Sequence, residues 1–166
     1  MGFQDRGLLK DRWCVPIHDN NGEQLGYTGR HVGKGKPKWL FPAGFPKDQV
    51  LFNLHRLIEP ESGQAISAGV VIVEGVGDCI RLHMRDIPAV AVLGTHVNKD
   101  HVAMLEAVGF TQALLLFDGD EQGRKAAEKS IATLATKLFA RDVQLPDDDD
   151  PETVSVEFLE QHLWWL

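Results

Sequence analysis

The sequence has few of the residues that mark secreted, membrane or zinc-binding proteins. It contains two cysteines, Cys14 and Cys79, which lie far apart and outside any C-x-x-C motif, so neither a disulfide framework nor a zinc finger is indicated. The seven histidines follow no H-E-x-x-H or similar ligand spacing. No segment approaches the roughly 18 apolar residues of a membrane span, and the first residues are charged where a signal peptide would be apolar. We therefore expect a cytoplasmic protein with no zinc and no membrane partner.

Charge is distributed unevenly along the chain, whose net charge is −7. Residues 1–60 carry nine basic and six acidic side chains, whereas residues 61–166 carry eight and eighteen. A protein that grips nucleic acid over its whole surface normally has a net basic footprint. We therefore expect any phosphate contacts in the first part of the chain and metal binding in the acidic second part.

Acidic residues follow two of the apolar runs. VVIV is followed directly by Glu74, and LLLF is followed by Asp118 and Asp120. Carboxylates held close together repel one another, so such a group usually has a cation between its members. On an extended segment Asp118 and Asp120 would point to the same side, with α-carbons about 6.6 Å apart. A helix cap or a solvated loop residue is the alternative interpretation of each aspartate.

The apolar periodicity predicts a hairpin followed by a parallel α/β unit. The hairpin strands are expected at 12–17 and 24–29, joined by a turn at Asn21-Gly22, and the basic stretch 30–47 is expected to be a loop. Further along, apolar runs alternate with helical patterns, as in a parallel sheet covered by helices, where sites form at the carboxyl ends of strands. The expected strands are 70–73, 89–93, 114–117 and 142–145, and the expected helices lie near 78–85, 98–109, 127–138 and 155–166.

Several segments occur in an order that is more specific than any one of them. EGVGDCIRLH, AVAVLGT, LLLFDGDEQGRKAA and LPDDDDPETV follow one another, and RWCVPIHDNNGEQLGYTGR and PKWLFP precede them. Together they resemble the Toprim domain, and within that family they are most similar to the catalytic core of bacterial DnaG-type DNA primases. The likeness covers nearly all of residues 12–153. Trp39 and Phe41 depart from the tyrosine and asparagine of the primase pattern.

The resemblance implies chemistry that depends on Mg²⁺, with Mn²⁺ as a possible substitute. It marks Glu74, Asp118 and Asp120 as catalytic residues and metal ligands, and it adds Asp78 and Asp150 as ligands of an outer ion. Glu74 is either a metal ligand or a general acid/base, and the sequence leaves both roles open. Magnesium prefers oxygen ligands at about 2.1 Å, which suits carboxylates from separate strands. Capping of a helix is the alternative role of Asp78, and a solvated loop is the alternative for Asp150.

The resemblance also implies a fold class and a division of the chain. We expect an α/β fold with a Toprim-like parallel sheet flanked by helices, preceded by a small subdomain made of a β-hairpin and a loop. The hairpin and loop subdomain would span residues 1–60, the Toprim domain 61–153, and a C-terminal helix 154–166.

The function implied is nucleotidyl or phosphoryl transfer on nucleic acid, and within that class RNA primer synthesis by a primase-like catalytic fragment or compact relative. The partners would be a single-stranded DNA template, nucleoside triphosphates, and other replication proteins or the primase domains that these residues lack. Arg30, Lys38 and Lys47 would contact the template or the incoming nucleotide. The alternatives are a Toprim nuclease, a non-catalytic accessory protein of a mobile element that binds nucleic acid, and a domain that keeps its acids but has lost activity.

Overall fold

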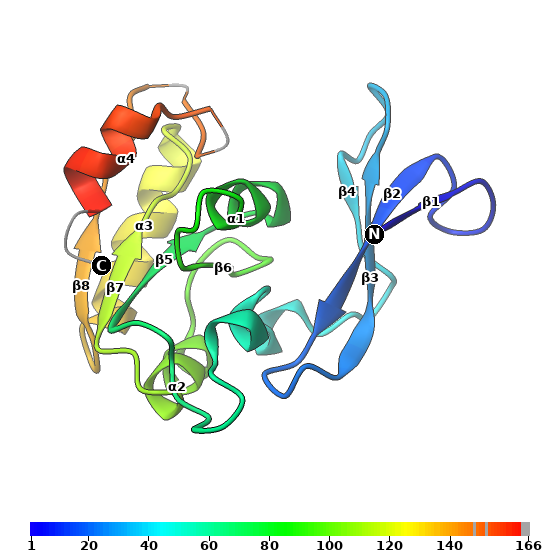
Figure 1. Ribbon diagram of the computed structural model, residues 1–166. Coiled ribbons are helices and arrows are strands. Elements are labelled where there is room, and N and C mark those ends of the chain that lie inside the picture. Colours follow the sequence, from blue (N-terminus) through cyan, green and yellow to red (C-terminus); the bar gives the residue numbers. More distant parts are fainter. Residues whose placement is uncertain (148, 152, 164–166) are drawn as a thin grey trace.

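Two four-stranded sheets form the frame of the computed structural model, which describes residues 1–147, 149–151 and 153–163 (Figure 1). The first sheet is antiparallel, with strand order β1-β2-β3-β4. The second is parallel, with order β6-β5-β7-β8. Within the described residues no helix is long and apolar enough to cross a membrane. This arrangement confirms the expected fold class, an α/β unit preceded by a small β subdomain.

The antiparallel sheet contains the expected hairpin and two further strands. Its members are β1 (Gly2–Gln4), β2 (Arg12–His18), β3 (Gln24–His31) and β4 (Trp39–Leu40). At the turn between β2 and β3, Gly22 has a φ of +83°, a conformation that glycine adopts without strain. The two short strands β1 and β4 had not been expected. Each pairs with an outer edge of the hairpin, β1 with β2 and β4 with β3. The stretch 30–47 that contains β4 has no apolar periodicity, so its sequence alone does not indicate a strand.

The parallel sheet is built by strands and helices that alternate along the chain. The elements are β5 (Gly69–Val73), α1 (Val76–His83), β6 (Ala89–Ala91), α2 (Lys99–Ala107), β7 (Gln112–Leu115), α3 (Glu121–Leu134), β8 (Phe139–Asp142) and α4 (Val156–Leu163). The chain passes from β5 to β6 on one side, then crosses back to β7 on the other side of β5. The boundary between β5 and β7 is therefore the point at which the strand order reverses, where sites form in open α/β sheets.

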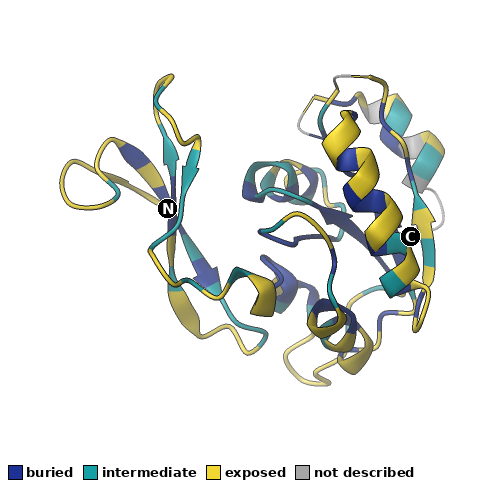
Figure 2. Ribbon diagram, turned by 180° about the vertical axis from the view of Figure 1, so that it is seen from behind, coloured by how far each residue is buried: buried dark blue, intermediate teal, exposed yellow. Residues whose placement is uncertain are grey.

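Each face of the parallel sheet buries its own hydrophobic core. Val70 and Ile72 of β5 point into one cluster, which also contains residues of α2 and α3. Val71 and Val73 point into the other, together with residues of α1, α4 and the antiparallel sheet. This alternation is expected of a central strand that is buried on both faces. Seen from behind, α3 carries an exposed stripe and a buried stripe, as an amphipathic helix on the sheet surface should (Figure 2).

Two expected strands are shifted towards the N-terminus. The strand expected at 114–117 is β7, which ends at Leu115, and the strand expected at 142–145 is β8, which ends at Asp142. The pairing between the two strands sets where each one ends, because every residue of β8 pairs with a residue of β7, from Phe139 with Gln112 to Asp142 with Leu115. The expected terminal helix is α4, and residues 164–166 of that expectation lie outside the described residues.

A short segment between the two sheets covers the free edge of β6. Phe52 pairs with Ala91 in an antiparallel bridge, and the buried Asn53 donates from Nδ2 to the carbonyl of Ala89 at 2.9 Å. Asn53 has a φ of +75° and a ψ of −3°, which places it in the left-handed region. The residue therefore combines a buried hydrogen bond with a backbone conformation that few side chains tolerate.

Substitution of Asn53 should separate these two contributions. Asn53→Gly removes the hydrogen bond without straining the backbone and should lower the free energy of unfolding by about 1–3 kcal/mol. Asn53→Ala should cost about 1 kcal/mol more, because alanine is strained at this φ. Urea denaturation of both variants measures the difference, and an alanine variant as stable as the glycine variant would contradict this account.

Candidate metal centre and nucleic-acid interface

Three neighbouring strands of the parallel sheet deliver acidic residues to one edge. Glu74 follows the last residue of β5, Asp118 and Asp120 follow β7, and an acidic loop that includes Asp147 and Asp150 follows β8. Because the strands are parallel and adjacent, their carboxyl ends meet at the same rim. Glu74 and Asp118 stand on either side of the point where the strand order reverses.

Glu74 has the most perturbed carboxyl group at this rim. Its pKa is raised from the ordinary value of 4.5 to about 7, first by burial and then by the negative charges of Asp118, Asp120 and Asp78. The backbone N–H of Asp118 donates to Glu74 Oε1 at 3.4 Å, a long hydrogen bond that offsets part of this effect. Glu74 thus lies within electrostatic reach of three of the other predicted ligands.

Asp118 is also destabilised in its charged form. Burial raises its pKa, the charges of Asp150 and Asp120 add to the shift, and the charge of Lys38 opposes it. Lys38 belongs to the antiparallel sheet subdomain, immediately before β4. The fold therefore brings together the acids of three strands and one lysine from the other sheet.

Asp120 begins α3 and does not continue the strand that precedes it. Its Oδ1 accepts a hydrogen bond from the backbone N–H of Gly123 at 2.7 Å, as a helix N-cap does. The expected extended geometry of Asp118 and Asp120 is therefore wrong, because the chain bends at Gly119. The Gly119 N–H donates to the carbonyl of Asp149 at 2.8 Å, and a Cβ at Gly119 would lie 2.0 Å from the carbonyl oxygen of Pro146.

Asp78 has the capping role that the sequence left as the alternative to metal binding. Its Oδ2 accepts a hydrogen bond from the Gly75 N–H at 3.2 Å and so caps α1. Its charge also raises the pKa of Glu74, so the two carboxylates are electrostatically coupled. A carboxylate has two oxygens and several lone pairs, so capping leaves acceptor capacity.

The loop after β8 places Asp150 and Asp147 differently. Asp150 accepts from the backbone N–H of Thr153 at 3.1 Å and lies close enough to Asp118 to raise its pKa. Asp147 forms a 3.1 Å ion pair with Arg124, which also donates to the carbonyl of Gly119 at 2.8 Å. Arg124 therefore neutralises Asp147 and fixes the bend at Gly119.

The chemistry of these side chains fits a hard divalent cation. All the donors are carboxylate oxygens, and burial, together with repulsion from neighbouring carboxylates, raises the pKa of both Glu74 and Asp118. No group of three or more His, Cys, Asp or Glu among the described residues is close enough to ligate one ion. Magnesium usually keeps several waters and binds through only one or two carboxylates plus substrate phosphates, so a tight protein cage is not required. Asp118 and Asp120 are electrostatically coupled, since the charge of Asp120 raises the pKa of Asp118 after burial and Asp150 have done so.

The three predicted basic residues have different surroundings. Lys38 is exposed and acts on Asp118, as described above. The Arg30 guanidinium lies over the Trp39 ring at 5.7 Å, and the Lys47 ammonium lies over the Phe41 ring at 4.1 Å. These two cation–π contacts hold their charges against aromatic faces of the antiparallel sheet and the loop after it.

Arg12 is a contributor that sequence reasoning missed. It is 5% exposed, and its Nη1 donates to the carbonyls of Gly29, Pro37 and Lys38 at 3.1, 2.9 and 3.4 Å. The buried guanidinium therefore ties the backbone beside Lys38 to β3. The sequence does hold an indication of this role. Arg12 is two residues from Cys14 on the predicted strand, so both side chains project from the same face, and Cys14 is buried.

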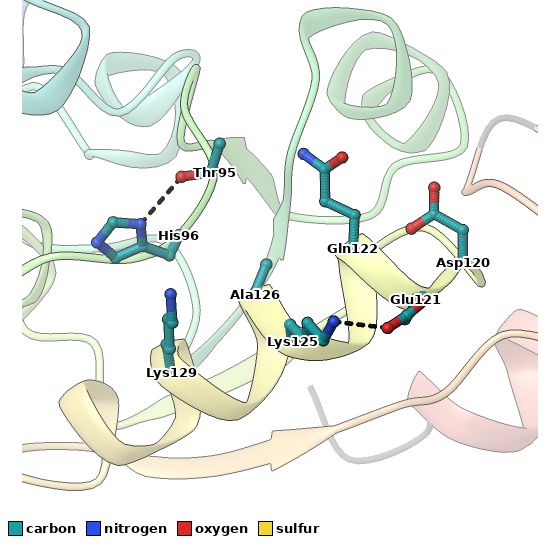
Figure 3. A pocket seen from close by; sticks show the side chains of 8 residues that line it. All are labelled: Thr95, His96, Asp120, Glu121, Gln122, Lys125, Ala126 and Lys129. Carbon is teal, nitrogen blue, oxygen red and sulfur yellow. Dashed lines mark hydrogen bonds and ion pairs between the residues drawn. The ribbon is translucent and has the colours of Figure 1, made fainter.

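A pocket of about 550 Å³ opens beside Asp120 (Figure 3). It lies between the loop after β6 and the first half of α3. Asp120 and an ion pair between Glu121 and Lys125 stand at one end, and Lys129 and His96 approach one another at the other end. The pocket thus extends from the rim that carries the acids along the surface of α3.

Comparison with known proteins agrees with this fold. The model of a family described as Toprim-like matches residues 71–155, which is more than half of the chain, so the chain belongs to the Toprim-like family. The proteins to which this chain is similar in sequence and structure are DNA primases, which confirms the resemblance inferred from the motifs.

Both sequences and solved structures carry this likeness. The chain is 33% identical over 156 residues to a DNA primase of Deinococcus radiodurans, an alignment that covers 89% of this chain and 27% of the relative. The Escherichia coli primase catalytic core matches with a TM-score of 0.78 and 28% identity over 96% of this chain and 55% of that one. A DnaG primase catalytic domain bound to single-stranded DNA matches with a TM-score of 0.76 and 28% identity over 97% and 51%. The chain spans about a quarter of the length of the curated relatives it matches.

Replacement of Glu74 should make stability depend less on pH. Below pH 4.5 the carboxyl is protonated in both the folded and unfolded states, and between 4.5 and about 7 only the folded state keeps the proton. The wild type therefore loses stability as the pH rises through this window. In EDTA, Glu74→Gln should exceed the wild type by about 1 kcal/mol at pH 8, after allowance for solvent screening, and by much less at pH 4.5.

Chemical denaturation at the two pH values measures this effect. The exposed Glu128 on α3 provides the control, because Glu128→Gln should change stability little at either pH. A Glu74→Gln advantage that is equal at both pH values would show that ionisation of this group has no cost in the folded protein.

Loss of the Arg12 guanidinium should loosen the antiparallel sheet. Arg12→Met keeps a long side chain but leaves buried carbonyls without a donor, so it should lower the free energy of unfolding by about 1–3 kcal/mol. Arg12→Lys retains one donor group and should lose less. Urea denaturation tests both variants, and a methionine variant with wild-type stability would mean that water replaces the guanidinium without cost.

Proposed function

We propose that this chain is a primase-like Toprim core that carries out metal-dependent nucleotidyl transfer on nucleic acid. The reaction is RNA primer synthesis from nucleoside triphosphates on a single-stranded DNA template, with Mg²⁺ as the metal and Mn²⁺ as a substitute. Other replication proteins, or further primase domains, are the proposed partners. The division into residues 1–60, 61–153 and 154–166 also stays a prediction.

The juxtaposition of the two sheets carries this proposal. The Toprim-like match begins at residue 71, whereas the likeness to primase catalytic cores covers 96% of this chain and so includes the antiparallel sheet. That sheet places Lys38 where its charge acts on Asp118. A lysine beside a carboxylate pair suits a substrate that carries phosphates and a bound cation together. A nuclease would need only the Toprim part of this arrangement.

The acidic residues have distinct proposed roles. Asp118 and Asp120 would hold the catalytic ion, and Asp150 and Asp78 would hold an outer ion. When bound, the metal would neutralise charge on the attacking and leaving oxygens of an in-line displacement at phosphorus. The acidic residues would hold the ion at the rim, and Lys38, whose charge acts on Asp118, would contact the phosphates.

Glu74 has a pKa that suits proton exchange near neutral pH. Its pKa of about 7 lets it accept or donate a proton at Oε1 under ordinary conditions. As a metal ligand it would instead lose its proton on ion binding. Arg30 and Lys47 are proposed to meet the template or the incoming triphosphate through charges already held against aromatic rings.

A priming assay tests the proposal directly. The protein is incubated with single-stranded DNA templates, labelled ribonucleoside triphosphates and either Mg²⁺ or Mn²⁺. We expect labelled oligoribonucleotides from the wild type, a loss of at least 100-fold in Asp118→Asn, as for removal of a group that stabilises developing charge, and unchanged synthesis in Glu128→Gln.

The products of the same assay separate the alternatives. Cleavage of the template without oligoribonucleotides, also lost in Asp118→Asn, would replace the polymerase proposal with a nuclease. Binding of DNA without either product would leave an accessory role. Synthesis that survives in Asp118→Asn would overturn the assignment of this site.

A further inference from the structure

The antiparallel sheet carries a row of side chains that crosses all of its strands. Strand register places Phe3 opposite Trp13, Trp13 opposite Arg30, and Arg30 opposite Trp39. Residues directly opposite one another in a sheet project from the same face. The measured contacts agree, since the Phe3 and Trp13 rings meet edge to face at 5.9 Å and Arg30 lies over Trp39 at 5.7 Å.

This row lies on the face that looks towards the parallel sheet. Trp13 projects from β2 on the same side as Val15 and Ile17, which are buried in the shared core, and Trp39 contacts that core at the near end of the row. Phe3 and Trp13, at the far end, are 49% and 50% exposed. The row therefore runs from the vicinity of the acidic rim outwards to solvent, as the positions of β4 and β1 also indicate (Figure 1).

We propose that the row of Phe3, Trp13, Arg30 and Trp39 is a stacking platform for the bases of single-stranded nucleic acid. Strands lie about 4.8 Å apart, so the row spans about 14 Å. Other four-stranded sheets use surface aromatics to stack about two or three bases. Arg30 offers a planar cation between aromatic rings, which suits a base with a phosphate nearby and does not suit an apolar protein surface.

Charge and continuity favour nucleic acid over a protein partner for this surface. Residues 1–60 carry more basic than acidic side chains, in contrast to the rest of the chain. Lys38 directly precedes Trp39 and acts on Asp118, so a strand stacked on the row would lead to the acidic rim. The inference builds on the proposed function by giving the template a surface, but its test needs no catalysis.

Binding of a labelled oligothymidylate of about 12 nucleotides, followed by fluorescence anisotropy in EDTA, tests the platform. Phe3→Ala and Trp13→Ala should each weaken binding about fivefold or more. Tyr27→Ala is the matched control and should stay within about twofold. Tyr27 is an aromatic residue of the same sheet and is 44% exposed. It lies opposite Pro16, which projects from the other face of β2 than Trp13 does, so Tyr27 lies on the face away from the row. Circular dichroism verifies that each variant is folded.

Two further readouts separate stacking from charge. Trp13→Ala should leave the dependence of affinity on salt unchanged, whereas Lys38→Ala should reduce its logarithmic slope by about 0.7. An abasic oligonucleotide of the same length should bind the wild type and Trp13→Ala equally. Asp118→Asn should still bind the intact oligonucleotide, so failure of primer synthesis does not affect this result. Unchanged affinity in both aromatic variants, or a change in self-association alone, would overturn the platform and indicate a protein interface.

Discussion

Carboxylates from β5, β7 and the loop after β8 are forced towards one another by the order of the strands. The chain leaves β5 in one direction and returns to β7 on its other side, so Glu74 and Asp118 flank the reversal point. Their burial is energetically unfavourable for the charged forms, and each negative charge makes the next less favourable. Binding of a cation at this rim should therefore stabilise the folded protein.

The antiparallel sheet brings complementary charge to this rim. The buried Arg12 donates hydrogen bonds to the backbone around Lys38. Burial raises the pKa of Asp118, and the charge of Lys38 opposes this rise. The uneven charge of the sequence therefore follows the fold, since the antiparallel sheet lies in the basic part of the chain and the parallel sheet in the acidic part.

Most of the fold and part of the site could be predicted from the sequence. The Asn21-Gly22 turn and the apolar runs identified the hairpin and the parallel strands, because each is a local signal. The bend at Gly119 depends on a carbonyl supplied by the loop after β8, and β1 and β4 exist only through pairing. Arg12 and the row from Phe3 to Trp39 likewise emerge from register between strands, which single-sequence patterns do not specify.

Isothermal titration calorimetry with Mg²⁺ at pH 7 tests the central claim most directly, when performed in two buffers with different enthalpies of ionisation. Since Glu74 has a pKa of about 7, ion binding to the wild type should be accompanied by release of a fraction of a proton, so that the observed heat changes with the buffer. The Asp118→Asn, Asp120→Asn double variant should give neither the binding heat nor the proton release. Indistinguishable titrations of the wild type and the double variant would contradict the account.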